Sequence, residues 1–211
     1  SGQSCVAGSR LYLQENISEI FMKELLSKVK KIKLGDPILE DTQMGPLCTG
    51  KQKEKIIKEI KKAIQQGAKI IFGGNTRNNK NDFFYPPTIL ECPHQKLKIM
   101  DTELFGPVLC FSKFKDEKEV IKFANNTKYG LAAGIFTKNM SKGLRVSKKI
   151  RAGIIWINTY RVVSPIAEFG GFSHSGNGRE SGFQAIFDYT KTKTVWINTS
   201  DEPIKNPFIM R

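Results

Sequence analysis

The sequence has few of the residues that form metal sites or disulfide frameworks. Its 211 residues include four cysteines and two histidines. The cysteines stand at positions 5, 48, 92 and 110, far apart and with no C-x-x-C pair. Zinc sites and disulfide frameworks need closely spaced ligands or paired cysteines, so this spacing favours neither and indicates a reducing compartment. We therefore predict no metal and a cytoplasmic location.

Long hydrophobic runs are absent as well. No stretch approaches the roughly 18 consecutive apolar residues of a membrane span, and no charged segment followed by an apolar run opens the chain, as it would in a signal peptide. Hydrophobic residues nevertheless make up 39% of the sequence, which is enough for a folded core. The sequence predicts a soluble globular protein without a membrane partner.

Acidic residues are scarce relative to basic ones. The chain has 34 lysines and arginines against 20 acidic residues, a net charge of +14. Clustered basic residues bind nucleic acid, but here they are spread along the chain. A predicted helix over residues 49–66 carries six lysines opposite an isoleucine-rich face, which is typical of a solvated surface helix. We predict no nucleic-acid partner.

Apolar strands alternate with amphipathic helices along the chain. Strands that are apolar on both faces and alternate with such helices are typical of a parallel sheet covered on both sides. The sequence therefore predicts an α/β fold, an open and mostly parallel sheet with helices on both faces. Because prolines 86 and 87 precede it, the segment 88–90 is predicted as an edge or irregular strand. The predicted strands are 10–14, 69–72, 88–90, 108–111, 131–137, 153–157 and 192–197, and the predicted helices are 16–31, 49–66, 116–125, 139–149 and 179–188. The predicted N-caps are Asn16 or Ser18 for the first of these helices, Asp116 for the third, and Asn139 or Ser141 for the fourth.

The first ten residues present a cysteine among small side chains. Cys5 stands between Gly2 and Gly8, whose backbones can approach a ligand closely. A turn of small residues leaves the sulfur uncovered and supplies backbone N–H groups that favour the reactive thiolate. The alternative is a buried structural cysteine, which is common for a lone thiol.

Residues 2–10 resemble the active-site cysteine segment of the aldehyde dehydrogenase superfamily. Three further motifs resemble that family in the same order. Residues 103–108 resemble its cofactor-contacting turn, residues 156–160 and 169–172 together resemble its substrate-pocket loop, and residues 175–182 resemble the segment after that loop. The resemblance extends to about residue 198. On these motifs the chain is identified as the C-terminal catalytic and oligomerisation half of a family member.

The resemblance implies a division of the chain. Residues 1–175 would form the catalytic domain, and residues 176–211 a C-terminal helix, an oligomerisation strand and a tail. In the family this last strand pairs with a neighbouring subunit, which implies a homodimer or homotetramer. The N-terminal cofactor domain and the general-base glutamate would lie outside this chain, so we expect it to be a fragment that is inactive alone.

The resemblance also implies a reaction. Cys5 would attack an aldehyde to give a thiohemiacetal, hydride would pass to NAD or NADP, and water would hydrolyse the thioester to a carboxylic acid. The backbone N–H of Cys5 would stabilise the developing oxyanion.

Three residues match cofactor-binding positions of the family. Glu103 would accept hydrogen bonds from the nicotinamide ribose, and Phe105 would brace the nicotinamide. Gln52 matches a position near the adenosine ribose. Without the motif, Glu103 is an exposed turn carboxylate and Gln52 a solvent-facing helix residue.

Three further residues match the family's substrate pocket: Asn158, Val163 and Phe169. The alternatives are a polar strand end for Asn158 and plain core for Phe169. Glu180 matches a position behind the cysteine, where it would relay protons, although an ion pair with Arg179 is the simpler role.

Two other functions fit the same motifs. A relative that transfers the acyl group to coenzyme A would differ in its acyl acceptor. A non-catalytic assembly module would keep the fold without the chemistry, and alkylation of Cys5 no faster than that of the other cysteines would favour this module.

Overall fold

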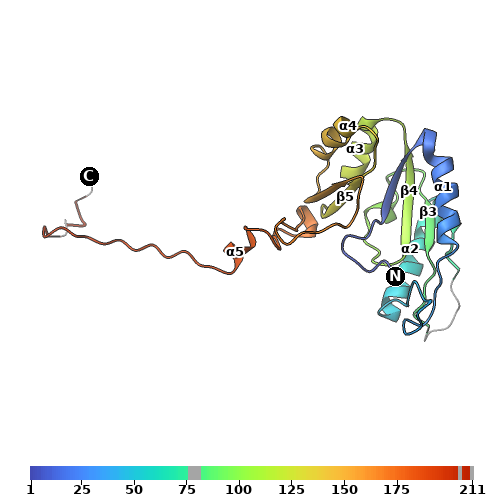
Figure 1. The fold of residues 1–211 in the computed structure, drawn as a ribbon, viewed down its shortest axis with the longest axis horizontal. Coiled ribbons are helices and arrows are strands. Elements are labelled where there is room, and N and C mark those ends of the chain that lie inside the picture. The colour runs from blue at the N-terminus through green and yellow to red at the C-terminus, as the bar shows by residue number, and fades with distance from the viewer. Residues whose placement is uncertain (76–81, 204–205, 210–211) are drawn as a thin grey trace.

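The computed structural model describes residues 1–75, 82–203 and 206–209. Its elements follow the predicted alternation of strands and helices (Figure 1). In chain order they are β1 (Arg10–Gln14), α1 (Glu15–Val29), α2 (Gly50–Gln65), β2 (Lys69–Phe72), β3 (Thr88–Glu91), the 3-10 helix η1 (Lys98–Asp101), β4 (Val108–Phe114), α3 (Glu117–Asn125), β5 (Ala132–Ile135), α4 (Met140–Ser147), β6 (Ile154–Ile157), the 3-10 helix η2 (Ser173–Ser175) and α5 (Ala185–Asp188).

The larger sheet has four strands in the order β1-β4-β3-β2. β4 is parallel to both β1 and β3, and only β2, at the edge, runs antiparallel. Of the two alternatives predicted for residues 88–90, the edge strand is wrong, because β3 lies inside the sheet. The pairing of β3 with β2 is irregular, with a register shift between Ile70 and Phe72. The prolines precede the ladder, and Thr88 supplies the first N–H, which donates to the Pro107 carbonyl at 2.8 Å.

Both faces of this sheet are buried. Along β4, Val108 and Cys110 pack into the core beneath α2, whereas Phe111 packs into a second core that includes Met22 of α1. Successive side chains of a strand point to opposite faces, so this alternation places one helix on each side of the sheet. The predicted covering of both faces is confirmed.

A second, smaller sheet pairs β5 and β6 in parallel. Figure 1 shows it beside the larger sheet, together with α3 and α4. The helix starts follow the predicted chemistry: the Asp116 side chain accepts from the Glu119 N–H, and the Asn139 side chain accepts from the Lys142 N–H. The mostly parallel α/β fold is thus confirmed, divided between two sheets.

Two details of the predicted helices are wrong. Neither Asn16 nor Ser18 caps α1: the helix begins at Glu15, and the Ser18 hydroxyl donates to the Glu15 carbonyl. In α2, Lys53 is not on a solvated face but is 6% exposed. Its ammonium group contacts the Asp82 carbonyl and lies 3.9 Å from the Asp82 carboxylate, which satisfies the buried charge.

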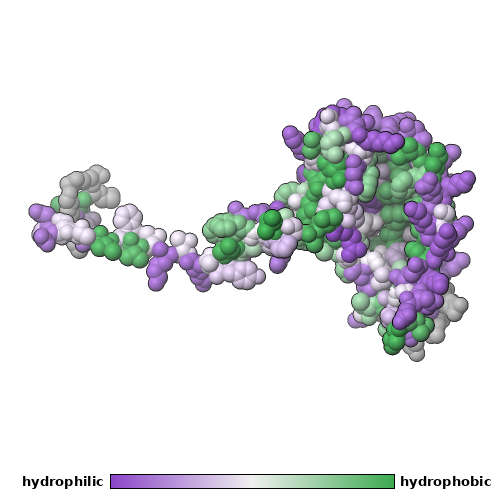
Figure 2. Space-filling model, viewed as in Figure 1, coloured by the Kyte–Doolittle hydropathy of each residue, from purple (hydrophilic) through white to green (hydrophobic). Residues whose placement is uncertain are grey.

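The C-terminal segment has little regular structure. The predicted helix over 179–188 is reduced to the four residues of α5, and residues 192–197 form no strand within the described chain. An extended segment becomes a strand only when a neighbour accepts its hydrogen bonds, so a single chain leaves this one unpaired. Trp196 is 90% exposed, and hydrophobic residues are visible along the tail that leads away from the body (Figure 2). The domain division at residue 175 stays a prediction.

Neither a membrane span nor a metal cluster is found in the parts of the chain that the structure describes. No helix there has the length and apolar character to cross a bilayer. Over the same residues, no three or more His, Cys, Asp or Glu side chains gather to hold a metal ion.

We expect the core between α2 and the larger sheet to contribute strongly to the stability of the fold. Ile56 is fully buried, whereas Ile64 of the same helix is 44% exposed. Ile56→Ala should lower the free energy of unfolding by about 2–5 kcal/mol, because it removes buried methyl groups and leaves a cavity. Chemical denaturation of the variant and of the matched Ile64→Ala control measures this difference, and equal losses for the two would contradict the assignment of the core.

Candidate active site

Cys5 lies in an exposed turn before β1. The turn is closed by the Ala7 N–H, which donates to the Ser4 carbonyl at 3.0 Å. Cys5 is exposed, while the next side chain, Val6, is buried at 9% exposure and anchors the turn. The Cys5 N–H forms no hydrogen bond with the residues that the structure describes. The alternative of a buried structural cysteine is wrong.

The sheet register places Cys5 beside the turn that carries Glu103 and Phe105. Parallel strands β1 and β4 pair Arg10 with Cys110. Cys5 and Phe105 each lie five residues before this pair, so both turns lie at the same edge of the sheet.

Close backbone contact fixes the two turns against each other. Gly2 has φ +73°, and a β-carbon there would collide with the Gly106 carbonyl group. A side chain at position 2 would therefore force the segments apart.

Two side chains of α2 bind the backbone of the Glu103 turn. The Gln52 amide contacts the Leu104 carbonyl and donates to the Phe105 carbonyl at 3.0 Å, and the Lys55 ammonium donates to the Glu103 carbonyl at 2.9 Å. Gln52 is thus bound to the turn rather than facing solvent. The side chains of Glu103 and Phe105 remain exposed, with Phe105 in a left-handed conformation at φ 53°.

Asn158 joins the ends of the two short strands. Its side-chain oxygen accepts from the Thr137 N–H at 2.8 Å, and its amide nitrogen donates to the Thr137 carbonyl at 2.9 Å. These contacts support its reading as a polar strand end, while its substrate role stays a prediction.

The other predicted pocket residues lie on the loop after β6. Val163 is 67% exposed, and Phe169 is half-buried. Phe169 forms two backbone hydrogen bonds of 2.7 Å with Glu180, whose side chain is exposed. The structure therefore brings Phe169 and Glu180 together through their backbones.

The predicted ion pair between Arg179 and Glu180 is wrong. The Arg179 guanidinium donates to the carbonyls of Gly171 and Gly178 at 2.8 and 2.9 Å and lies over the Phe172 ring. Among the described residues these carbonyls and the ring, not a carboxylate, are its partners. Arg179 thus braces the loop.

Sequence reasoning missed Tyr160, to which it gave no role. The Tyr160 hydroxyl donates to the Val6 carbonyl at 3.1 Å, from 154 residues further along the chain. Its ring packs edge-on against Trp156, with centroids 4.9 Å apart. Tyr160 therefore connects the loop after β6 to the turn that carries the cysteine. Its place in the motif 156–160 was the only signal in the sequence.

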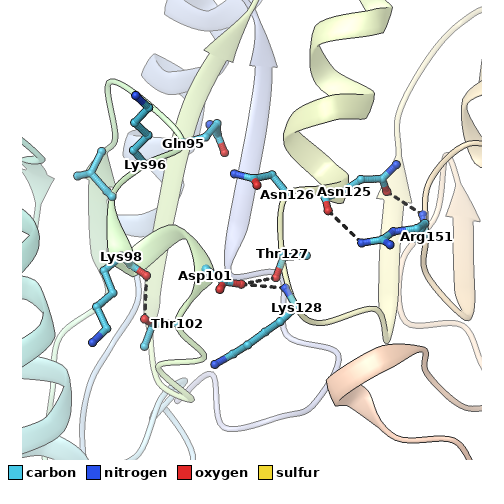
Figure 3. Close-up of a pocket in the computed structure, with 11 residues that line it drawn as sticks. Gln95, Lys96, Lys98, Asp101, Thr102, Asn125, Asn126, Thr127, Lys128 and Arg151 are labelled. Carbon is cyan, nitrogen blue, oxygen red and sulfur yellow. Dashed lines mark hydrogen bonds between the residues drawn. The ribbon is translucent and has the colours of Figure 1, made fainter.

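A separate hollow of about 590 Å³ lies between η1 and the end of α3 (Figure 3). The Asp101 carboxylate connects η1 to the segment after α3, because it accepts from the Thr127 hydroxyl at 2.8 Å and from the Lys128 N–H at 3.0 Å. On the far side, Arg151 binds the Asn125 side chain through its N–H. None of the predicted site residues lines this hollow.

The exposed Cys5 turn thus lies at one edge of the α/β sheet, beside the turn of Glu103 and Phe105, and comparison with known families identifies the class of protein. The aldehyde dehydrogenase family model matches residues 1–195. The chain belongs to this family, as the four motifs predicted.

Individual relatives are similar over most of the chain. It is 50% identical over 212 residues to (Z)-2-((N-methylformamido)methylene)-5-hydroxybutyrolactone dehydrogenase of Acinetobacter baylyi. This match covers 100% of the present chain and 43% of the relative. It is 41% identical over 201 residues to aldehyde dehydrogenase 1A1 of Mus musculus, covering 95% of this chain and 40% of the relative. The chain thus spans less than half the length of these relatives.

Solved structures show the same fold. Betaine aldehyde dehydrogenase of Staphylococcus aureus, a point mutant in complex with NAD+ and with a BME-modified cysteine, matches with a TM-score of 0.91 and 36% identity over 96% of this chain and 42% of that one. An aldehyde dehydrogenase mutant of Bacillus cereus matches with a TM-score of 0.89 and 38% identity, over 94% and 40% of the two chains.

Proposed function

We propose that this chain supplies the catalytic cysteine of an NAD(P)-dependent aldehyde dehydrogenase that oxidises an aldehyde to a carboxylic acid. The observation that carries the proposal is the exposed Cys5 turn, packed through Gly2 onto the turn of Glu103 and Phe105. Family membership supports the reaction class.

In the proposed reaction the Cys5 sulfur attacks the carbonyl carbon of the aldehyde and forms a carbon–sulfur bond. The carbonyl oxygen becomes an oxyanion, to which the unbonded Cys5 N–H donates. A nicotinamide cofactor, NAD+ or NADP+, would supply the acceptor for the hydride that leaves this carbon. Water then cleaves the thioester, which releases the acid and restores the thiol.

The residues around Phe105 fit a nicotinamide cofactor. The exposed Glu103 carboxylate offers acceptors for ribose hydroxyls, and the exposed Phe105 ring offers an apolar face for the nicotinamide. Gln52 donates to the carbonyl of Phe105 and would thereby hold this turn in position against the cofactor. The NAD+ complex of the Staphylococcus aureus relative supports NAD as cofactor.

We place the substrate pocket along the loop that follows β6. Val163 and Phe169 would provide apolar walls, and Asn158 would fix the start of the loop through Thr137. The exposed Glu180 carboxylate, tied by its backbone to Phe169, would relay protons near the pocket.

The rest of the protein would complete the site. Because the chain spans less than half of its relatives, we propose that an N-terminal half binds the cofactor and supplies the base. Residues 192–197, which are β-branched or aromatic except for Lys193, would form a strand with a second subunit in a homodimer or homotetramer. Relatives named as cytosolic support a cytoplasmic location.

Kinetics of the full-length protein test this function. The protein should reduce NAD+ or NADP+ in the presence of an aldehyde and release the acid without coenzyme A. A useful panel comprises betaine aldehyde, an aliphatic aldehyde, an aromatic aldehyde and a 5-hydroxybutyrolactone. A strict requirement for coenzyme A would favour the acylating alternative, and no reduction with any substrate would favour the assembly module. The isolated 211 residues should show no activity.

A further inference from the structure

Tyr160 is partly buried, and segments that are far apart in the sequence contact its side chain. A β-carbon at Gly134 would lie 2.7 Å from its ring, and one at Gly8 would lie 3.6 Å from its hydroxyl. Trp156 packs against the ring, and the Trp156 indole N–H donates to the Val162 carbonyl at 2.7 Å. The two glycines leave the space that the tyrosine fills, and the ring has little freedom to move.

Within the described part of the chain, the Tyr160 side chain forms one hydrogen bond, and its partner belongs to the cysteine turn. Its hydroxyl donates to the carbonyl of Val6, the residue that directly follows Cys5. Burial raises the pKa of Tyr160 above its ordinary value of 10.0, against a smaller opposing effect of the Arg161 charge. The hydroxyl therefore stays protonated, and can donate, at neutral and mildly alkaline pH.

The same loop carries the proposed pocket wall. Trp156 binds the backbone of Val162, one residue before Val163, and packs on Tyr160. A continuous set of contacts thus runs from the proposed substrate loop through Tyr160 to the Val6 carbonyl.

We propose that Tyr160 is a positioning residue for the nucleophile: its hydroxyl fixes the Val6 carbonyl, and thereby the orientation of the Cys5 N–H and sulfur relative to a substrate held by the loop after β6. The proposal rests on the proposed function. It assigns Tyr160 to the chemical step and not to substrate affinity, because the hydroxyl is engaged with the backbone of the cysteine turn.

A purely structural role would make Tyr160 resemble Tyr12. Tyr12 is also a partly buried tyrosine whose hydroxyl donates to a backbone carbonyl, that of Phe123, at 3.2 Å. Burial raises its pKa as well, although the Arg10 charge opposes this effect. The Tyr12 hydroxyl also contacts Arg10 and Gln95, and none of its partners belongs to the cysteine turn. Tyr12→Phe therefore removes a partly buried hydroxyl that has no contact with that turn, and it serves as the control.

The test compares Tyr160→Phe and Tyr12→Phe in the full-length protein. Loss of one hydrogen bond of about 1 kcal/mol should lower kcat of Tyr160→Phe about five-fold with KM nearly unchanged. The rate of alkylation of Cys5 by iodoacetamide, divided by that of the exposed Cys48, should fall in the same variant. Tyr12→Phe should leave both quantities as in the wild type.

Three outcomes would overturn the proposal. These are wild-type kcat and labelling ratio in Tyr160→Phe, a rise in KM with kcat unchanged, or equal effects of the two variants. If the wild type oxidises no aldehyde, the proposed function fails, but the labelling ratio still decides the role of Tyr160.

A second variant disturbs Tyr160 without altering it. In Gly134→Ala the new methyl group would press on the ring of Tyr160, so it should lower the Cys5-to-Cys48 labelling ratio as Tyr160→Phe does. If Tyr160→Phe fails to fold, a wild-type ratio in Gly134→Ala would by itself contradict the proposal.

Discussion

Replacing Cys5 with serine in the full-length protein should reduce aldehyde oxidation by at least about 10³-fold, since loss of a covalent nucleophile removes the whole pathway and not one contact. A serine hydroxyl is a weak nucleophile unless a base activates it. The exposed position of Cys5 makes the exchange structurally mild, so the fold should be retained. Steady-state reduction of the cofactor measures the loss.

Cys48→Ser is the matched control for this experiment. Cys48 is also an exposed free cysteine, and its backbone N–H donates to the Gln3 side chain, which the substitution preserves. It should keep wild-type kcat. If Cys5→Ser retained more than about 5% of the wild-type kcat, another group would have to act as the nucleophile.

Gly2→Ala should lower kcat by about 10²-fold, the loss that a displacement of about 1 Å can cause at a catalytic centre. Gly2 has φ +73°, which disfavours any side chain, and its β-carbon would collide with the Gly106 carbonyl. The collision is with backbone, so the Cys5 segment and the Glu103 turn must move apart. The expected loss is in kcat, because the variant separates the nucleophile from the proposed cofactor turn.

Gly45→Ala provides the comparison for Gly2→Ala. A β-carbon there would meet only Pro37, at an ordinary contact distance of 3.7 Å. This variant should keep wild-type kinetics. Wild-type kcat in Gly2→Ala, or the same loss in both glycine variants, would show that contact between the two turns does not matter for the reaction.

Local patterns predicted most of the fold. The caps at Asp116 and Asn139 and the strands 10–14 and 69–72 follow from residues close in sequence. The position of β3 inside the sheet did not follow, because strand order depends on distant partners. Residues 192–197 differ for a related reason: their β-branched and aromatic residues favour a strand, but the partner strand would come from elsewhere.

The site was predictable in its parts but not in its connections. The motifs predicted Cys5 and the Glu103 turn, and the register of β1 with β4 shows why they meet. The hydrogen bonds of Gln52 and Tyr160 reach backbone carbonyls far along the chain. Backbone acceptors are the same at every residue, so no sequence pattern marks them.

The most direct test of a reactive Cys5 is its alkylation rate at neutral pH, measured cysteine by cysteine with peptide mass spectrometry. Cys92 and Cys110 are 1% and 3% exposed, so the reagent reaches both poorly and both should react slowly. The hydrogen bond between them raises the pKa of Cys110 and lowers that of Cys92, so burial and not the pKa is what protects Cys92. Cys48 is the decisive reference because it is exposed like Cys5. We predict that Cys5 reacts faster than Cys48, and a Cys5 that reacts no faster would contradict its role as the nucleophile.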